Sequence, residues 1–316
     1  MKTIFFGTPE TAVPFLRLLA SKSEIVAVVS QPDKPAGRGL ATAATPVKAA
    51  ALELGLKILQ PAKPSEIAAE LTAFGADLAV VVAYGRILKA EVLSSTRLGF
   101  LNVHFSLLPK YRGAAPVQWS LVRGEKKTGV TLFWLDEGMD TGPIQSVAET
   151  DIAADEDAPQ LLSRLTALGV ALLNDSLADI AAGGVVRRAQ EGAPSSAPLI
   201  KREDARLDLS RPAEELRNQV RGFRSWPRAW LELASGKVLV LKTGAAGPSD
   251  PRGTGAPGSV LAVERGRGIL VECSSRSRLW LLEVQPEGKK SLSAAEFANG
   301  LRLAVGGFLP LSGKTI

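Results

Sequence analysis

The sequence has almost none of the side chains that form disulfides and zinc sites. Its 316 residues include one cysteine, Cys273, and one histidine, His104. A single cysteine cannot form a disulfide within the chain, and with a single histidine it cannot supply the ligands of a zinc site. We therefore expect no metal centre, although these counts leave a carboxylate-bound Mg²⁺ open.

Long apolar runs are also missing. The run "LAVVVAY" at residues 78–84 is far shorter than the ~20 residues that cross a bilayer. At the N-terminus, "MKTIFFGTPE" carries Pro9 and Glu10 before it reaches the length of a signal peptide. We expect no membrane-spanning helix, no membrane partner and a cytoplasmic protein.

Positive charge is present and unevenly placed. The net charge is +6, and residues 201–316 hold 19 Lys and Arg against 12 Asp and Glu. A basic C-terminal part is typical of a domain that binds a polyanion, because cationic side chains neutralise phosphates of any sequence. Ordinary solubilising charge explains the same excess, so charge alone leaves both interpretations open.

The N-terminal part alternates short β-rich runs with helical patterns, which is typical of an α/β domain with a parallel sheet. After the first run, Gly7 marks a turn, and Thr8 as N-cap followed by Pro9 predicts the start of a helix. A dinucleotide fingerprint requires glycine where Pro9 stands, so an NAD-type cofactor is unsupported. The predicted strands are "KTIFF", "EIVAVVS", "KILQP", "DLAVVVAY", "FLNVHF" and "GVTLFWL".

The composition changes after a helical pattern at residues 157–182. Residues 189–204, "AQEGAPSSAPLIKRED", are rich in Pro, Ser and Ala and indicate a linker. The short β-like runs that follow predict a small β-barrel, and an oligonucleotide-binding (OB) barrel suits the local positive charge. We predict a Rossmann-like α/β domain with a mostly parallel sheet at 1–188 and a smaller OB-like β-barrel domain at 205–316.

Polar side chains gather where a central strand is predicted to end. Asn102 and His104 share one face of that strand, because side chains two residues apart point the same way. Ligands of open α/β sheets bind beyond the carboxyl ends of the strands, and Asp140, in a Gly-flanked loop, can reach the same crevice. Each residue alone is more often structural, but their joint presence in a chain with no other histidine predicts a catalytic site.

Several motifs together resemble those of the methionyl-tRNA formyltransferase family, almost from end to end. Members transfer a formyl group from 10-formyltetrahydrofolate to the amino group of methionine on initiator tRNA. The resemblance implies a formyltransferase domain followed by a tRNA-binding domain. The sequence leaves the oligomeric state open, and we expect a monomer. The motifs that carry it include "FFGTPE" at 5–10, "QPDKPAGRG" at 31–39, "VVVAYGRIL" at 80–88, "LNVHFSLLPKYRGAAP" at 101–116, "DEGMDTGPI" at 136–144, "SWPRAWLE" at 225–232 and "QPEGKK" at 285–290.

The resemblance also implies roles for individual residues. Asn102, His104 and Asp140 correspond to the catalytic set of the family. Lys34 and Arg38 lie in the long loop at 31–46, with which members reach the acceptor stem of the tRNA. The motif that contacts folate in the family corresponds here to Ser106, Leu107, Leu108 and Pro109.

These residue types suit formyl transfer. When an amine attacks the formyl carbon, the carbonyl oxygen becomes an oxyanion that donors such as the Asn102 amide and a His104 N–H stabilise. The new ammonium must lose a proton while the folate nitrogen gains one, which suits an imidazole near neutral pH. We expect Asp140 to orient His104 and to favour its protonated form, with water or Asp140 accepting the amine proton.

Two departures from the family pattern stand out. The segment "LATAAT" follows "GRG" where many members carry further lysines, so we expect this loop to grip the tRNA less strongly. Phe105 stands where a small residue commonly follows the histidine. Because it points to the opposite face of the strand from His104, we expect a repacked interior and unaltered chemistry.

Other functions stay open on the same residues. A formyltransferase acting on the amine of a ribonucleotide or a sugar nucleotide would share the N-terminal motifs, and the same site could hydrolyse the formyl group. A noncatalytic RNA-binding protein is a further alternative, which the intact Asn102, His104 and Asp140 argue against.

Overall fold

A computed structural model describes residues 1–36, 41–253 and 255–312. The chain folds as two compact units. The first consists of Met1–Pro116, Lys127–Asp151 and Leu162–Pro198, and the second of Val117–Lys126, Ile152–Leu161 and the chain from Leu199 onward. The domain boundaries drawn from composition, with a linker at 189–204, stay predictions.

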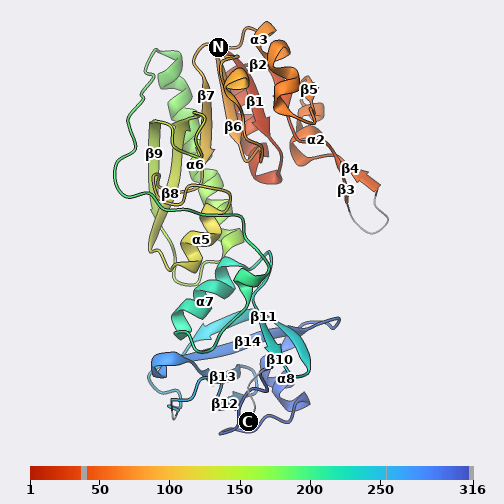
Figure 1. Ribbon diagram of the computed structural model, residues 1–316, viewed down its shortest axis with the longest axis vertical. Coiled ribbons are helices and arrows are strands. Elements are labelled where there is room, and N and C mark those ends of the chain that lie inside the picture. Colours follow the sequence, from red (N-terminus) through yellow and green to blue (C-terminus); the bar gives the residue numbers. More distant parts are fainter. Residues whose placement is uncertain (37–40, 254, 313–316) are drawn as a thin grey trace. The chain divides into compact units, whose positions relative to one another are not determined.

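A seven-stranded sheet forms the centre of the first unit, in the order β5-β2-β1-β6-β7-β8-β9 (Figure 1). The first five of these strands run parallel, and β8 and β9 run antiparallel to their neighbours. This arrangement confirms the mostly parallel α/β sheet. The strands are β1 (Lys2–Gly7), β2 (Glu24–Val29), β5 (Ile58–Leu59), β6 (Leu78–Val82), β7 (Phe100–His104), β8 (Lys127–Trp134) and β9 (Ile144–Asp151).

Helices pack on this sheet. One face, including Phe6 and Val81, packs against Leu71 of α3 and Val92 of α4, and these side chains are buried together. The described helices of this unit are η1 (Glu10–Ala12), α1 (Val13–Lys22), α2 (Pro46–Glu53), η2 (Pro64–Ile67), α3 (Ala68–Ala73), α4 (Ala90–Leu93) and most of α6 (Ala158–Ala181).

The turn after β1 differs from the expected helix cap. A Cβ on Gly7 would lie 2.7 Å from a ring carbon of Phe5, so glycine allows the close packing of this turn. The chain then enters a 3-10 turn at Glu10, and the prediction that Thr8 caps a helix is wrong. Instead the Thr8 hydroxyl donates to the carbonyl oxygen of Tyr84, at 3.1 Å, and ties β1 to the end of β6.

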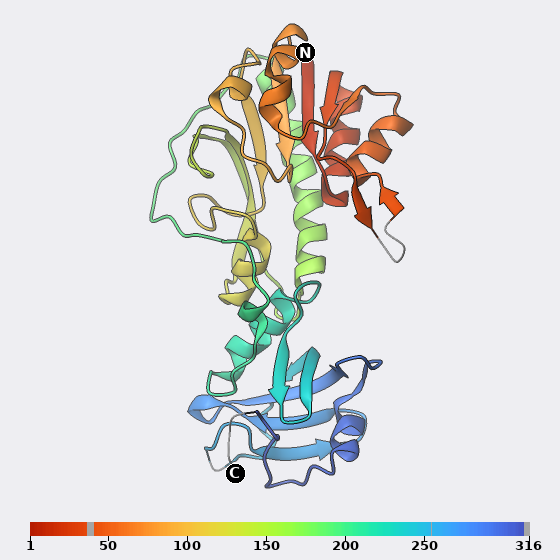
Figure 2. The same cartoon turned by 45° about the vertical axis from the view of Figure 1, so that its right-hand side comes forward.

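Helix α6 is the long helix predicted at residues 157–182. Within the described residues it is the one helix long and apolar enough to cross a membrane by length and composition, which the sequence interpretation had not expected. A Cβ on its Gly169 would lie 3.0 Å from Phe15 and 3.3 Å from Val130, so this helix packs closely against α1 and β8. Figure 2 shows α6 running alongside the sheet of that unit. Such contacts are those of a core helix.

The second unit contains an antiparallel sheet in the order β10-β11-β14-β13-β12, with β15 paired to β14. The C-terminal segment pairs with both edges: Phe308 bridges Ser259 beside β12, and Leu311 bridges Leu233 of β10. This irregular segment therefore links the two edges of the predicted barrel. The elements are α5 (Pro116–Val122), η3 (Glu203–Ala205), α7 (Ala213–Gly222), β10 (Trp230–Leu233), β11 (Gly236–Ala245), β12 (Val260–Glu264), β13 (Gly268–Glu272), η4 (Ser274–Arg276), β14 (Arg278–Pro286), β15 (Leu292–Ser293) and α8 (Ala294–Gly300).

Candidate active site

Asn102 and His104 lie at the carboxyl end of β7, between the parallel strand β6 and the antiparallel strand β8. Their two-residue spacing puts them on one face of the strand, as predicted. His104 is only 6% exposed. Within the described part of the chain, the side-chain amide of Asn102 has no hydrogen-bond partner, so its donors remain available to a ligand.

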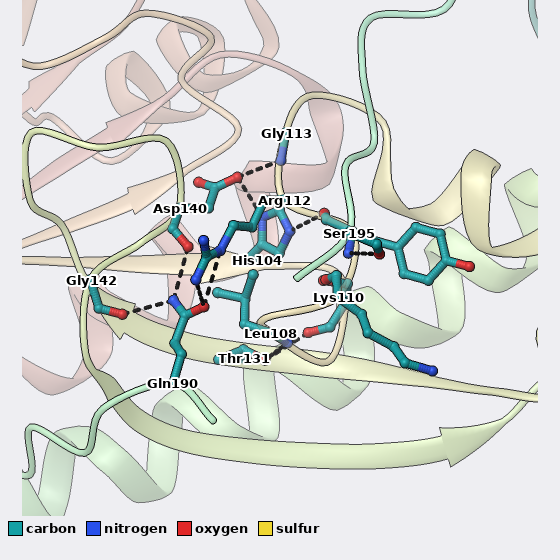
Figure 3. A network of polar contacts seen from close by, with 12 residues as sticks. His104, Leu108, Lys110, Arg112, Gly113, Thr131, Asp140, Gly142, Gln190 and Ser195 are labelled. Atoms are coloured by element: carbon teal, nitrogen blue, oxygen red, sulfur yellow. Dashed lines mark hydrogen bonds and ion pairs between the residues drawn. The ribbon is translucent and has the colours of Figure 1, made fainter. Parts of the chain in front are cut away.

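The two ring nitrogens of His104 face different groups (Figure 3). The Nε2 atom lies 2.9 Å from the carbonyl oxygen of Tyr111. Because a carbonyl oxygen can only accept, this contact requires a proton on Nε2. The Nδ1 atom lies 3.7 Å from Oδ2 of Asp140. The Nδ1 atom is therefore the ring nitrogen that remains for chemistry.

Asp140 lies in the loop between β8 and β9, with a φ of 54°. Its Oδ2 atom accepts a hydrogen bond of 2.7 Å from the N–H of Gly113. The distance from Oδ2 to Nδ1 of His104 is that of an ion pair and exceeds a hydrogen bond. The structure thus brings together the three residues that the sequence pattern singled out, with Asp140 facing Nδ1 of His104 beyond hydrogen-bond distance.

The "SLLP" segment turns directly beyond His104. The Ser106 hydroxyl donates to the carbonyl oxygen of Lys110 at 2.7 Å, and the Thr131 hydroxyl donates to the carbonyl oxygen of Ser106 at 2.7 Å. The N–H of Leu108 donates to the same Thr131 oxygen, and Leu108 precedes a cis peptide bond to Pro109. Hydrogen bonds within the chain therefore hold this turn in place.

The four residues of the "SLLP" segment differ in their exposure to solvent. Ser106, Leu108 and Pro109 are buried, whereas Leu107 is half-buried. Phe105 points the other way and packs edge-on against Phe15, with ring centroids 6.3 Å apart. The side chain of Phe105 therefore fills the interior behind β7, as its place on the strand predicts.

The loop at 31–46 contains a two-stranded hairpin, β3 (Lys34–Ala36) with β4 (Ala41–Ala43). Lys34 is exposed at its base, and Arg38 lies outside the described residues. Asp33 accepts hydrogen bonds from Gln60 at 2.7 Å and from Lys48 at 2.5 Å, which lower the pKa of its carboxyl. The base of the hairpin is thus tied to α2 and to the residue that follows β5.

Three polar residues around the site escaped the sequence interpretation. The amide of Gln190 donates to the carbonyl oxygen of Asp140, and the hydroxyl of Ser195 accepts from the N–H of Tyr111 (Figure 3). The guanidinium of Arg112 donates to the amide oxygen of Gln190. Gln190 and Ser195 stand in the stretch interpreted as a linker. A glutamine or serine in a Pro- and Ser-rich stretch carries no signal of such contacts.

The described residues include no group of three or more His, Cys, Asp or Glu side chains that could hold a metal ion. The buried Cys273 is a free thiol, and its burial raises its pKa to about 12. A thiol with so high a pKa is inert as a nucleophile.

Comparison with protein families defines the class. A model described as formyl transferase matches residues 1–177, and one described as formyl transferase, C-terminal domain, matches residues 199–302. Methionyl-tRNA formyltransferase of Elusimicrobium minutum is 45% identical over 97% of this chain and 98% of its own. The enzyme of the same name from Sorangium cellulosum is 42% identical, with the same coverage. The chain therefore belongs to the methionyl-tRNA formyltransferase family, within the formyl transferases.

Solved structures share the fold at low identity. The sugar 3N-formyl transferase WlaRD is 18% identical with a TM-score of 0.68, covering 92% of this chain and 99% of its own. HypX from Aquifex aeolicus, solved in complex with tetrahydrofolic acid, is 18% identical with a TM-score of 0.62, covering 97% of this chain and 48% of its own. Both likenesses concern the architecture alone.

Proposed function

We propose that this protein transfers the formyl group of 10-formyltetrahydrofolate to the amino group of methionine on initiator tRNA, with Asn102, His104 and Asp140 as the catalytic residues. The observation that carries the proposal is their convergence at the carboxyl end of β7 in a chain of this family. The alternatives on ribonucleotide or sugar-nucleotide amines lack a comparable argument, because the relatives that match nearly end to end are methionyl-tRNA formyltransferases.

Asn102 stabilises the charge that develops on the formyl oxygen. Attack of the amine on the formyl carbon forms a C–N bond and moves the carbonyl π electrons to oxygen. The Asn102 amide, which has no partner among the described residues, can donate to this oxyanion. A preorganised donor of this kind contributes about 3–4 kcal/mol to the stability of the transition state.

His104 carries the proton between the two nitrogens. Because Nε2–H donates to Tyr111, the neutral ring offers the lone pair of Nδ1 to the ammonium formed on attack. The imidazolium that results faces the Asp140 carboxylate at 3.7 Å, which stabilises its charge. As the carbonyl reforms and the bond to N10 of the folate breaks, Nδ1–H returns the proton to N10.

This scheme revises one expectation. The sequence suggested that a His104 N–H donates to the oxyanion and that Asp140 or water accepts the amine proton. The contact between Nε2 and Tyr111 leaves Nδ1 alone for the reacting groups, so we assign proton transfer to His104 and oxyanion stabilisation to Asn102.

We place the folate-type donor against the "SLLP" turn. Leu107 is the half-buried side chain of the segment and can cover a flat ring, while backbone groups of the turn supply polar contacts. Ser106, Leu108 and Pro109 are buried, so they act by shaping the turn.

For the tRNA we propose contacts from both units. Lys34 lies on the hairpin of the first unit, and Arg38 belongs to the same loop. In the second unit, Lys237 lies 4.1 Å and Arg206 5.8 Å from the ring centre of Trp230, which joins cationic and stacking groups at one surface. We expect a cytoplasmic monomer, in keeping with an enzyme that acts on charged tRNA.

An acceptor panel tests the proposal. The purified protein and labelled 10-formyltetrahydrofolate are incubated with initiator methionyl-tRNA, elongator methionyl-tRNA, a sugar-nucleotide amine, a ribonucleotide amine or buffer alone. We expect rapid transfer to the initiator and slow transfer to the elongator. Preferred transfer to either small amine, or release of formate in buffer alone, would overturn the proposal.

A further inference from the structure

Residues 188–197 run along the two loops that carry the catalytic groups. Arg188 exchanges two backbone hydrogen bonds with Ile144, beyond the Asp140 loop, at 2.6 and 3.0 Å. The N–H of Arg112 donates to the carbonyl oxygen of Ser195 at 2.8 Å, and the carbonyl oxygen of Arg112 accepts from Ala197 at 2.7 Å. Both loops are therefore bound to one continuous segment of chain.

The side chain of Gln190 holds the Asp140 loop. Its Nε2 atom donates to the carbonyl oxygens of Asp140 and Gly142, each at 2.8 Å. Its Oε1 atom accepts from Nη2 of Arg112 at 2.7 Å and from Nε at 3.2 Å. Two donors and two acceptor positions are all that an amide has, so every one is used and the orientation of the side chain is determined.

The side chain of Ser195 holds the histidine loop. The hydroxyl oxygen of Ser195 accepts from the N–H of Tyr111 at 2.9 Å. The carbonyl oxygen of Tyr111 in turn accepts from Nε2 of His104. Asp140 and Tyr111 both have positive φ angles, of 54° and 61°, which side-chain-bearing residues disfavour. Gln190 and Ser195, from outside those two loops, help to hold these conformations.

We propose that Gln190 and Ser195 are positioning residues for formyl transfer. Gln190 sets the place of Asp140, and Ser195 sets the place of Tyr111 and, through it, the ring of His104. Together they fix the 3.7 Å between Asp140 and Nδ1 of His104. This inference rests on the proposed function of those two residues, and it gives a catalytic purpose to a segment whose composition indicates only a linker.

Gln190→Glu tests the first arm. The carboxylate keeps the acceptor for Arg112 and loses both donors to the Asp140 loop. Because a displacement of about 1 Å can cost 100-fold in rate, we expect kcat to fall by about 10- to 100-fold with KM for both substrates unchanged. Glu191→Ala, an exposed neighbour, is the matched control and should keep the wild-type kcat.

Ser195→Ala tests the second arm with a readout that does not depend on activity. His104 is the only histidine, so ¹⁵N-histidine labelling gives one set of imidazole signals that report which nitrogen carries the proton. We expect Nε2–H in the wild type and a mixture of tautomers after Ser195→Ala. Ser195→Thr, which keeps the hydroxyl, should restore the wild-type signals, and Ser196→Ala, an exposed neighbour, should not change them.

The outcomes separate the inference from the function it rests on. A kcat of Gln190→Glu within twofold of that of Glu191→Ala would overturn the positioning role of Gln190. A fall in kcat no larger than the fall in the folded fraction of the variant at the assay temperature would also overturn it. Unchanged imidazole signals in Ser195→Ala would overturn that of Ser195. A wild type that forms no formylmethionyl-tRNA yet shows the expected imidazole signals would contradict the proposed function and leave the structural arm supported.

Discussion

The Nε2 atom of His104 lies 2.9 Å from the carbonyl oxygen of Tyr111, and this contact occupies one of the two nitrogens of the only imidazole in the chain. Since the carbonyl accepts, Nε2 keeps its proton, and Nδ1 faces Asp140. In the proposed mechanism, His104 therefore transfers the proton through Nδ1 alone.

The assignment of the proton to Nε2 predicts that His104→Gln and His104→Ala differ in thermal stability, although both lose activity. In His104→Gln, the side-chain amide can still donate to Tyr111, but no atom replaces the basic Nδ1. We expect kcat to fall by about 10²- to 10⁴-fold, the usual contribution of a general acid–base, with thermal stability close to the wild type. His104→Ala should lose similar activity and also stability, because the Tyr111 carbonyl becomes unpaired. Near-normal turnover of His104→Gln would remove the proposed proton transfer.

Asn102 should be separable from folding. Its amide has no partner within the described residues, so Asn102→Ala removes a group that the folded chain does not use. We expect unchanged unfolding by urea and a kcat lower by about 10²- to 10³-fold, the effect of losing one oxyanion donor. Asn102→Asp replaces the donor with a like charge beside the oxyanion and should be slower still. Equal rates in Asn102→Ala and the wild type would exclude the oxyanion role.

The close approach at Gly113 makes a third prediction. Gly113 has a φ of 122°, and a Cβ there would lie 2.6 Å from the carbonyl oxygen of Ala197. Gly192 also has a positive φ, of 99°, but a Cβ there meets nothing within 4 Å. Gly113→Ala should therefore destabilise the protein more than Gly192→Ala, which should cost about 1 kcal/mol from its dihedral angle alone. Gly113→Ala should also lower kcat, because the Gly113 N–H binds Asp140. Equal unfolding midpoints would contradict this reading of the packing.

Acid stability should depend on Asp250 in the second unit. Hydrogen bonds from Arg267 and from the indole of Trp280 lower the pKa of Asp250 to about 2, below its ordinary value of 3.8. A carboxyl whose pKa is lowered on folding stabilises the fold above its unfolded pKa and loses that effect as pH falls through the folded pKa. The wild type should thus lose stability between about pH 4 and pH 2.

The variant Asp250→Asn should be less stable than the wild type at neutral pH and should show a weaker pH dependence over that window. Tryptophan fluorescence during urea unfolding reports both, since Trp280 touches Asp250. Asp179→Asn, at an exposed position of α6, serves as the control and should follow the wild type. Parallel curves for Asp250→Asn and the wild type would show that the ion pair does not contribute.

Much of this site could be predicted from local sequence. The run "FLNVHF" has the period and composition of a strand, so Asn102 and His104 could be placed together at its end, and the glycines around Asp140 indicated a loop. The antiparallel direction of β8 could not be predicted, because an apolar strand has the same periodicity whichever way it runs.

The contacts of Gln190 and Ser195 could not be predicted from local sequence, for a different reason. Gln190 bonds to backbone groups 48 and 50 residues away, and Ser195 to one 84 residues away. A hydrogen bond from a side chain to a distant backbone group places no demand on the residues next to it, so composition indicated only a linker. The cap predicted at Thr8 failed similarly, because its hydroxyl binds Tyr84, 76 residues away.

The most direct test of the proposed chemistry is a single-turnover measurement with initiator methionyl-tRNA and saturating 10-formyltetrahydrofolate, comparing the wild type with Asp140→Asn. The amide of this variant keeps an acceptor for the Gly113 N–H and removes only the charge that faces Nδ1 of His104. We predict formylmethionyl-tRNA from the wild type, and from the variant a chemical step slower by at least about 100-fold at unchanged tRNA affinity. A wild type that forms no formylmethionyl-tRNA, or a variant that forms it at the wild-type rate, would contradict the proposal.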